Sequence, residues 1–181
     1  MVAIVLEPYS SEWPEMFARE KRCIESALDG LAIQVHHTGS TSVPGLRAKP
    51  IIDITLAVPD STDEHAYLPA LVDAGYELVL REPEWFEHRL FRGRDPKVNL
   101  HTYSADCEEI PRMLAFRDWL RTHPDDRELY EREKRRLAEQ HWDTVQDYAD
   151  AKTEVIREIV GRALAGDGTD VHGTDDGAGR P

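Results

Sequence analysis

Two features of the segment HTGSTSVPGLRAKPIIDITLAV, residues 37–58, point to chemistry. The first is a loop of small residues, Gly39-Ser40-Thr41-Ser42. The second is Asp53, near the start of a run that is otherwise apolar and reads as a strand. Aspartate is a poor strand former, and burial of an unpaired carboxylate is costly. Asp53 therefore either caps a local structure or holds a cation.

The loop is a candidate phosphate-binding site, because its unhindered backbone N–H groups and three hydroxyls can contact phosphate oxygens. It is not a Walker A sequence, since five residues rather than four separate Gly39 and Gly45. In addition, Leu46-Arg47 stands where that motif requires Lys-Ser/Thr. The alternative is an ordinary turn rich in serine and threonine.

Asp53 is the candidate metal ligand, with Mg²⁺ or Mn²⁺ as the expected cofactor. Mg²⁺ prefers oxygen ligands and needs only one or two carboxylates when a substrate supplies phosphate oxygens. Asp53 follows Ser40 by thirteen positions, which allows the loop to fold back beside it. A structural aspartate that caps the loop is the competing interpretation.

The apolar pattern predicts an α+β fold with one mixed sheet, helices mainly on one face, and a helical C-terminal part. The expected strands cover 31–37, 50–58, 76–80, 84–92 and 97–103, and the last two form a hairpin. The expected helices cover 12–28 and 63–74, and three more lie between 108 and 165. Within 127–140, charges of both signs at helical spacing indicate a solvated, ion-paired face that includes Lys134.

A length of 181 residues suits one domain over 1–165, followed by a Gly/Asp-rich tail over 166–181 that we expect to be disordered. The N-terminus lacks the basic region of a signal peptide, and no apolar run is long enough to cross a bilayer. These features predict a cytoplasmic protein. A formal charge of −13 argues against nucleic acid or an anionic membrane as the partner.

Several segments resemble known families. A Gly-Ser pair followed by an aspartate on the next strand is similar to the polymerase-β-type nucleotidyltransferase fold. More narrowly, GSTSVPGLRAKPIIDI, RDWLRTHPDDRELYEREKRRLA and YADAKTEVIREIV resemble the GrpB family of uncharacterised proteins. The resemblance implies a nucleotidyltransferase-like fold. GrpB-like domains also occur fused to dephospho-coenzyme A kinases, which implies a nucleotide or coenzyme as ligand.

By this resemblance, Gly39 and Ser40 would hold a triphosphate and Asp53 would bind the metal. The superfamily places a second acid two residues further along the same strand, where this chain has Thr55. Its third acid lies on a later strand, where this chain offers Asn99 and His101. The substitutions argue against the usual pair of carboxylates that binds two metal ions.

His101 is a candidate general base near neutral pH, a metal ligand, or a partner for Asp53, and a structural histidine is the alternative. A site of mixed His and Asp ligands would shift the preference from Mg²⁺ toward Mn²⁺ or Zn²⁺. Glu87 is a candidate replacement acid or a solvent-facing glutamate. The adjacent His36 and His37 are a weaker candidate for a zinc pair.

Basic residues are expected to complete a site for an anion. Lys49 precedes the Asp53 strand, and Arg89 and Arg92 belong to the following hairpin. Tyr148 and Lys152 are four apart on one helix face and match a tyrosine and lysine of the family. They would stack on a base and contact a phosphate. Salt bridges to surface acids, and a packed tyrosine beside a lysine, are the competing readings.

The sequence therefore predicts a metal-dependent transferase that moves a nucleotidyl group from a nucleoside triphosphate to a small acceptor. The nucleotide would lie against Gly39, Ser40, Thr41, Ser42, Lys49, Arg89, Arg92, Tyr148 and Lys152, with Asp53 and His101 as catalytic residues. The alternative is a non-catalytic nucleotide- or coenzyme-binding module, which Thr55 and Asn99 favour. A purely structural protein would leave the loop and Asp53 unexplained.

Overall fold

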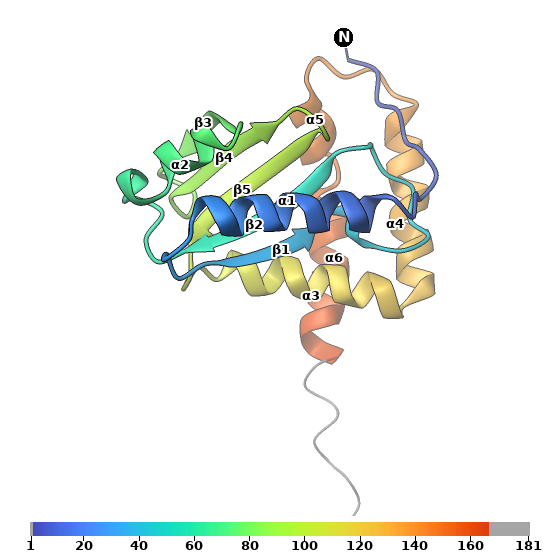
Figure 1. Cartoon of the computed structure of the whole chain (residues 1–181). Coiled ribbons are helices and arrows are strands. Elements are labelled where there is room, and N and C mark those ends of the chain that lie inside the picture. The colour runs from blue at the N-terminus through green and yellow to red at the C-terminus, as the bar shows by residue number, and fades with distance from the viewer. Residues whose placement is uncertain (1, 167–181) are drawn as a thin grey trace, which may run out of the picture.

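The computed structural model describes residues 2–166, which form a five-stranded sheet flanked by helices (Figure 1). The strands are β1 (Gln34–Thr38), β2 (Ile52–Val58), β3 (Glu77–Glu82), β4 (His88–Gly93) and β5 (Val98–Ser104). The helices are α1 (Trp13–Ala27), α2 (Leu68–Asp73), α3 (Glu109–Thr122), α4 (Pro124–Ala138), α5 (Val145–Asp150) and α6 (Thr153–Gly166). Two short 3₁₀ turns, η1 (Ser40–Ser42) and η2 (Glu64–Ala66), lie in the connections.

The strand order is β1-β2-β5-β4-β3, and only the central pair β2–β5 is parallel. The α+β class and the mixed sheet expected from the sequence are thereby confirmed. In the parallel pair, Asp53 lies opposite Asn99 and Thr55 lies opposite His101. Because side chains alternate along a strand, all four belong to the same face of the sheet.

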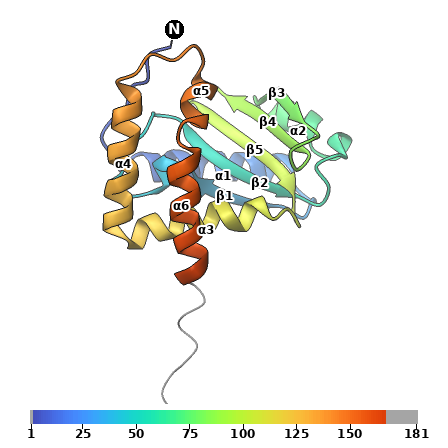
Figure 2. The ribbon, with the colours of Figure 1, turned by 180° about the vertical axis from the view of Figure 1, so that it is seen from behind.

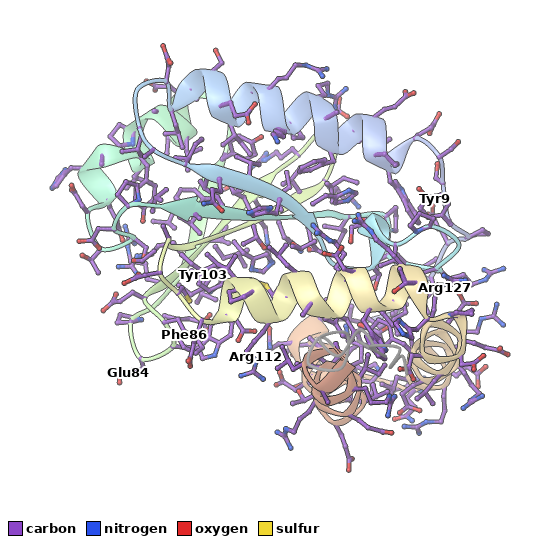
Figure 3. The ribbon with its side chains drawn as sticks, turned by 90° about the horizontal axis from the view of Figure 1, so that it is seen from below. Tyr9, Glu84, Phe86, Tyr103, Arg112 and Arg127 are labelled. Carbon is purple, nitrogen blue, oxygen red and sulfur yellow. The ribbon has the colours of Figure 1, made fainter. Side chains whose placement is uncertain are left out.

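Helices cover both faces of the sheet, so the expectation that they pack mainly on one face is wrong. Figure 3 shows α1 on one side of the sheet and α3 on the other. On the α3 side, Ala57 and Tyr103 pack against Ile110. Figure 2 shows α6 and α5 on this same side, leaving part of β4 and β5 uncovered.

Several element boundaries also differ from the expected ones. The fourth strand begins only at His88, because residues 83–87 form a turn in which Phe86 and Glu87 have positive φ. The helix expected over 63–74 is divided into η2 and α2, and the C-terminal part contains four helices rather than three. The tail expected over 166–181 lies outside the described residues, apart from Gly166 at the end of α6.

The main core lies between the sheet and α1 and α2. It contains the alternate β2 residues Ile52, Ile54, Leu56 and Val58, together with Leu100, Phe91, Ile24 and Leu71. A second cluster joins the C-terminal helices through Leu120, Tyr130 and Ile159, and it takes in Val43 and Leu46 from the loop after η1. The loop that carries the Gly-Ser turn is therefore anchored by its own apolar side chains to the C-terminal helices.

None of the helices between residues 2 and 166 is long and apolar enough to cross a membrane.

The central strands are expected to be the most sensitive part of the fold. Leu100 on β5 is 0% exposed, whereas Leu80 on the edge strand β3 is 43% exposed. Replacing Leu100 by alanine removes buried methyl groups and leaves a cavity, so Leu100→Ala should lower the free energy of unfolding by about 2–5 kcal/mol. Leu80→Ala is the matched control and should cost no more than about 0.5 kcal/mol. Urea unfolding measures both, and equal losses would contradict this assignment of the core.

Candidate functional site

The Gly39-Ser40 turn lies directly against Asp53. Gly39 has a φ of +66°, and a Cβ at this position would lie 2.3 Å from Asp53 Oδ2. Glycine is therefore required both for the backbone conformation and for the close approach of the carboxylate. The hydroxyls of Thr38 and Thr55 hydrogen-bond at 3.0 Å beside this contact.

Three of the chain's five lysines converge on this turn. Lys134 is only 2% exposed, and its ammonium donates to Ser40 Oγ at 3.1 Å and to the carbonyl of Arg47. The ammonium groups of Lys49 and Lys152 lie 5.6 and 4.7 Å from the centroid of the Tyr148 ring. Concentrating cations at one place in an acidic protein favours an anionic ligand there.

The lysines perturb one another. Burial lowers the pKa of Lys134 to about 7, and the charge of Lys152 lowers it further, against the opposing charges of Glu131 and Asp53. Burial also lowers the pKa of Lys49 and of Lys152, and Lys152 adds to the effect on Lys49. A bound phosphate would relieve both the desolvation and the mutual repulsion of these ammonium groups.

Asp53 is ionised and partly accessible, with 30% of its side chain exposed. Burial opposes its ionisation, but contacts with His101 and Asn99 and the charge of Lys49 hold its pKa below the ordinary value. The Asn99 amide donates to Asp53 Oδ1 at 2.9 Å, and His101 Nε2 lies 3.9 Å from the same oxygen. A carboxylate beside an imidazole nitrogen is a donor set that fits a divalent cation.

Asp53 and His101 alone provide few ligands for a metal ion. Within residues 2–166, no group of three or more His, Cys, Asp or Glu side chains is arranged to hold a metal ion. Asp53 and His101 could therefore hold a cation only if a substrate or water supplied the remaining ligands, as phosphates commonly do for Mg²⁺.

Behind His101 lie two residues that the sequence analysis did not select. His88 Nε2 lies 3.0 Å from His101 Nδ1, and His88 Nδ1 lies 2.7 Å from Glu82 Oε2. Burial lowers the pKa of His88 to about 4, and the charge of His101 lowers it further, against the effect of Glu82. One feature of the sequence could have indicated this contact. In the β4–β5 hairpin, side chains alternate between the two faces of the sheet, which places His88 on the same face as His101.

The structure treats the two candidate arginines differently. Arg92 lies opposite Asn99 on the site face, is exposed, and has no carboxylate partner among the described residues. Arg89 belongs to the opposite face, where it is buried and pairs with Glu64 at 2.6 Å and with Glu87 at 3.1 Å. Alternation along β4 thus keeps Arg89 away from the site, and Glu87 goes with it.

The other hydroxyls of the loop hold the turn itself. Ser42 Oγ donates to the Gly39 carbonyl at 2.6 Å, and Thr41 Oγ1 lies 3.0 Å from Nε2 of His37. Both residues are buried, so Ser40 is the accessible hydroxyl of the group. His37 also stacks on Phe17. Alternation along β1 places His36 and His37 on opposite faces of the sheet, so they do not form a zinc pair.

Tyr148 has a different position from the one expected. Its ring is 1% exposed and lies beneath the ammonium groups of Lys49 and Lys152. A buried ring has no free face for a nucleobase. The geometry supports a cation–π contact that positions the two lysines.

The GrpB family model matches residues 3–162, so the chain belongs to the GrpB family, as its motifs indicated. Over 163 residues it is 55% identical to the UPF0157 protein BH1888 of Halalkalibacterium halodurans, covering 90% of this chain and 84% of that protein. The crystal structure of conserved protein GrpB from Enterococcus faecalis matches with a TM-score of 0.79 and 33% identity, over 90% of this chain and 98% of that chain. A dephospho-CoA kinase of Mycolicibacterium paratuberculosis is 26% identical over 184 residues, which cover 87% of this chain and 45% of that protein.

Gly39 and Gly45 allow a matched test of the contact with Asp53. Both have positive φ, but a Cβ at Gly45 would meet nothing within 4 Å, whereas one at Gly39 would collide with Asp53. Each alanine variant should lose about 1 kcal/mol or more from backbone strain, and Gly39→Ala should lose clearly more because the carboxylate must move. Urea unfolding measures the difference, and equal losses would show that the contact is not a constraint.

His37 is expected to make stability depend on pH. Burial lowers its pKa to about 4 from 6.5, and Arg121 and Arg117 add to this against Asp53. Between these values the unfolded chain binds the proton and the folded chain does not, so stability falls as the pH drops from 6.5 toward 4. The contribution is at most about 1.4 kcal/mol per pH unit. Urea unfolding at pH 7 and pH 5 should show a smaller loss in His37→Asn than in wild type, and equal losses would contradict the assignment.

Proposed function

We propose that this chain binds the phosphate groups of a nucleotide at the Gly39-Ser40 turn, with a divalent cation at Asp53, and transfers a nucleotidyl group to a small acceptor. The observation that carries the proposal is the convergence of Lys49, Lys134 and Lys152 on a turn in contact with an ionised carboxylate. Neither a capping aspartate nor an ordinary turn requires that arrangement.

In this reaction the three lysines would stabilise negative charge on the phosphate groups. Phosphoryl-type transfer depends mainly on positioning and on stabilising the charge that develops on phosphate oxygens. Lys134 and Ser40 would contact the phosphates from one side, and Lys49 and Lys152 would contact them from another. A divalent cation held by Asp53 would supply further charge neutralisation at the transferred phosphate. Arg92, exposed on the same face, is placed to contact a more distant part of the ligand.

His101 is the candidate group for the acceptor. Its side chain is 28% exposed, and its Nε2 faces Asp53 across 3.9 Å. Neutral imidazole at this position can take the proton of an acceptor hydroxyl, and the neighbouring carboxylate would stabilise the resulting imidazolium. We include in the proposal a cytoplasmic setting and no nucleic-acid partner, because the charge of −13 disfavours one.

The second candidate function is a binding module without transferase activity. Two observations favour it: Thr55 is fully buried where a second carboxylate would be expected, and the Asn99 amide occupies one oxygen of Asp53. Its ligand would be a nucleotide or coenzyme, in keeping with the name of the dephospho-CoA kinase relative.

Thermal shifts test the proposal and separate the two functions. Wild type and Asp53→Asn are measured with ATP and with coenzyme A, each with Mg²⁺, with Mn²⁺ and without metal. A ligand at a hundred times its dissociation constant should stabilise by about 2.7 kcal/mol, which corresponds to roughly 5–10 °C for a chain of this size. We expect a metal-dependent shift with ATP that is lost in Asp53→Asn, each variant being compared with its own unliganded midpoint.

Lysine variants provide the matched control. Lys152→Met should reduce the shift, whereas Lys21→Met, which removes a lysine paired with Glu25 on α1, should leave it unchanged. A shift that does not depend on metal or on Asp53 would replace the transferase with the binding module. No shift with any of the ligands would contradict both functions.

A further inference from the structure

We propose that Glu82, His88 and His101 form a hydrogen-bonded relay that presents the lone pair of His101 Nε2 to Asp53. As a result, His101 and Asp53 bind a transition-metal cation in preference to Mg²⁺. The inference rests on the metal part of the proposed function and identifies the metal's chemical class. It does not depend on which nucleotide or acceptor is used. It replaces the general-base role considered for His101, because Nδ1 donates to His88 and Nε2 cannot hold a metal and accept a proton at the same time.

The direction of the relay follows from the hydrogen bonds. Glu82 Oε2 can only accept from His88 Nδ1 at 2.7 Å when the glutamate is ionised. The proton of His88 is therefore on Nδ1, and its Nε2 is left to accept from His101 Nδ1 at 3.0 Å. A neutral His101 then has its proton on Nδ1 and a free lone pair on Nε2.

The packing holds this arrangement in place. The rings of His88 and His101 are nearly parallel, with an interplanar angle of 18° and centroids 5.2 Å apart, and His88 also stacks on Tyr103. His88 is 3% exposed, and a neutral ring whose Nδ1 donates to Glu82 leaves Nε2 as an acceptor for His101. Trp85 closes the far side with an edge contact to His88. The ring of His101 therefore has a fixed partner on its Nδ1 side.

The Nε2 side of the His101 ring faces the carboxylate of Asp53. Its Nε2 and Asp53 Oδ1 lie 3.9 Å apart, which is too long for a hydrogen bond. A cation with ligands at about 2.1 Å sets neighbouring ligand atoms about 3 Å apart, so a small movement would close the site. Imidazole favours transition metals, whereas Mg²⁺ prefers oxygen ligands alone.

The relay has the form that metal-binding histidines usually show, in which the second ring nitrogen donates to a carboxylate or another acceptor. Here a second histidine lies between the ligand and the carboxylate. Glu82 and His88 are positioning residues in this proposal, because they act on the metal only through His101.

The tautomer can be observed directly in the metal-free protein. Ring ¹⁵N spectra at pH 7.5, assigned with His101→Gln, should show His101 with its proton on Nδ1 and an unprotonated Nε2. In free imidazole side chains the proton favours Nε2, so the relay predicts the less common form. A proton on Nε2, alone or together with one on Nδ1, would overturn the proposal.

Metal affinity tests the consequence. Co²⁺ and Mg²⁺ are titrated without nucleotide into wild type, Glu82→Ala, His88→Phe and the control Glu77→Ala. Glu77 is an exposed glutamate on the same strand that pairs with Arg94. Loss of a partner behind a metal-binding histidine typically weakens affinity by about 10–100-fold. We expect that loss for Co²⁺ in Glu82→Ala and His88→Phe, no loss in Glu77→Ala, and wild-type affinity for Mg²⁺ throughout.

Glu82→Ala keeps the test valid if His88→Phe fails to fold, since Glu82 lies partly exposed on the edge strand. Unchanged Co²⁺ affinity in Glu82→Ala would overturn the relay. If metal-dependent ATP binding through Asp53 persists in that case, the proposed function stands without it. If instead the relay variants weaken Co²⁺ binding but ATP produces no shift, the metal site stands and the nucleotide does not.

Discussion

The close approach of Gly39 to Asp53 is the constraint on which the rest of the site depends. The carboxylate occupies space that any other side chain at position 39 would need, so the loop and β2 must be built as one unit. The loop is held there from two directions, because Val43 and Leu46 enter the core of the C-terminal helices and Lys134 binds Ser40 from α4. The helical part of the chain therefore does more than cover the sheet: it fixes the turn against the carboxylate.

This arrangement is costly to the free protein. A lysine such as Lys134 loses hydration when it is buried, and its hydrogen bonds to Ser40 and to the Arg47 carbonyl recover only part of that loss. Lys49 and Lys152 are also desolvated, and the single carboxylate of Asp53 balances them incompletely. Natural proteins retain such local costs mainly where a ligand later offsets them. The electrostatics thus favour a bound anion for a physical reason that is independent of family membership.

Much of the fold could be predicted, and the limits have physical causes. Period-two alternation locates β2 and β5, and apolar residues at helical spacing together with turn residues locate the main helices. Asp53 stands out because it interrupts an apolar strand. The prediction that Lys134 lies on a solvated helix face is wrong, because Tyr130, Lys134 and Leu137 recur at helical spacing on the buried face of α4. The sequence analysis places Arg89 at the site, whereas it lies on the opposite face of the sheet. Which β4 side chains share a face with the site depends on the register of β4 with β5, and the local sequence pattern does not determine that register. The Glu82–His88 contact could not be predicted, since it depends on how the β3–β4 turn closes.

The absence of a second carboxylate changes how the proposed reaction would handle charge, without excluding the reaction. In a two-metal centre, the second cation neutralises charge on the phosphates and leaving group. Here three ammonium groups and the exposed guanidinium of Arg92 are available for that task, and they need no additional acidic ligands to hold them. Thr55 fits this view, because a carboxylate at its fully buried position beside Thr38 would require a cation of its own. One carboxylate, one imidazole and a cluster of lysines can therefore form a coherent charge balance for a polyphosphate, in which the protein supplies the positive charge that a second metal would otherwise bring.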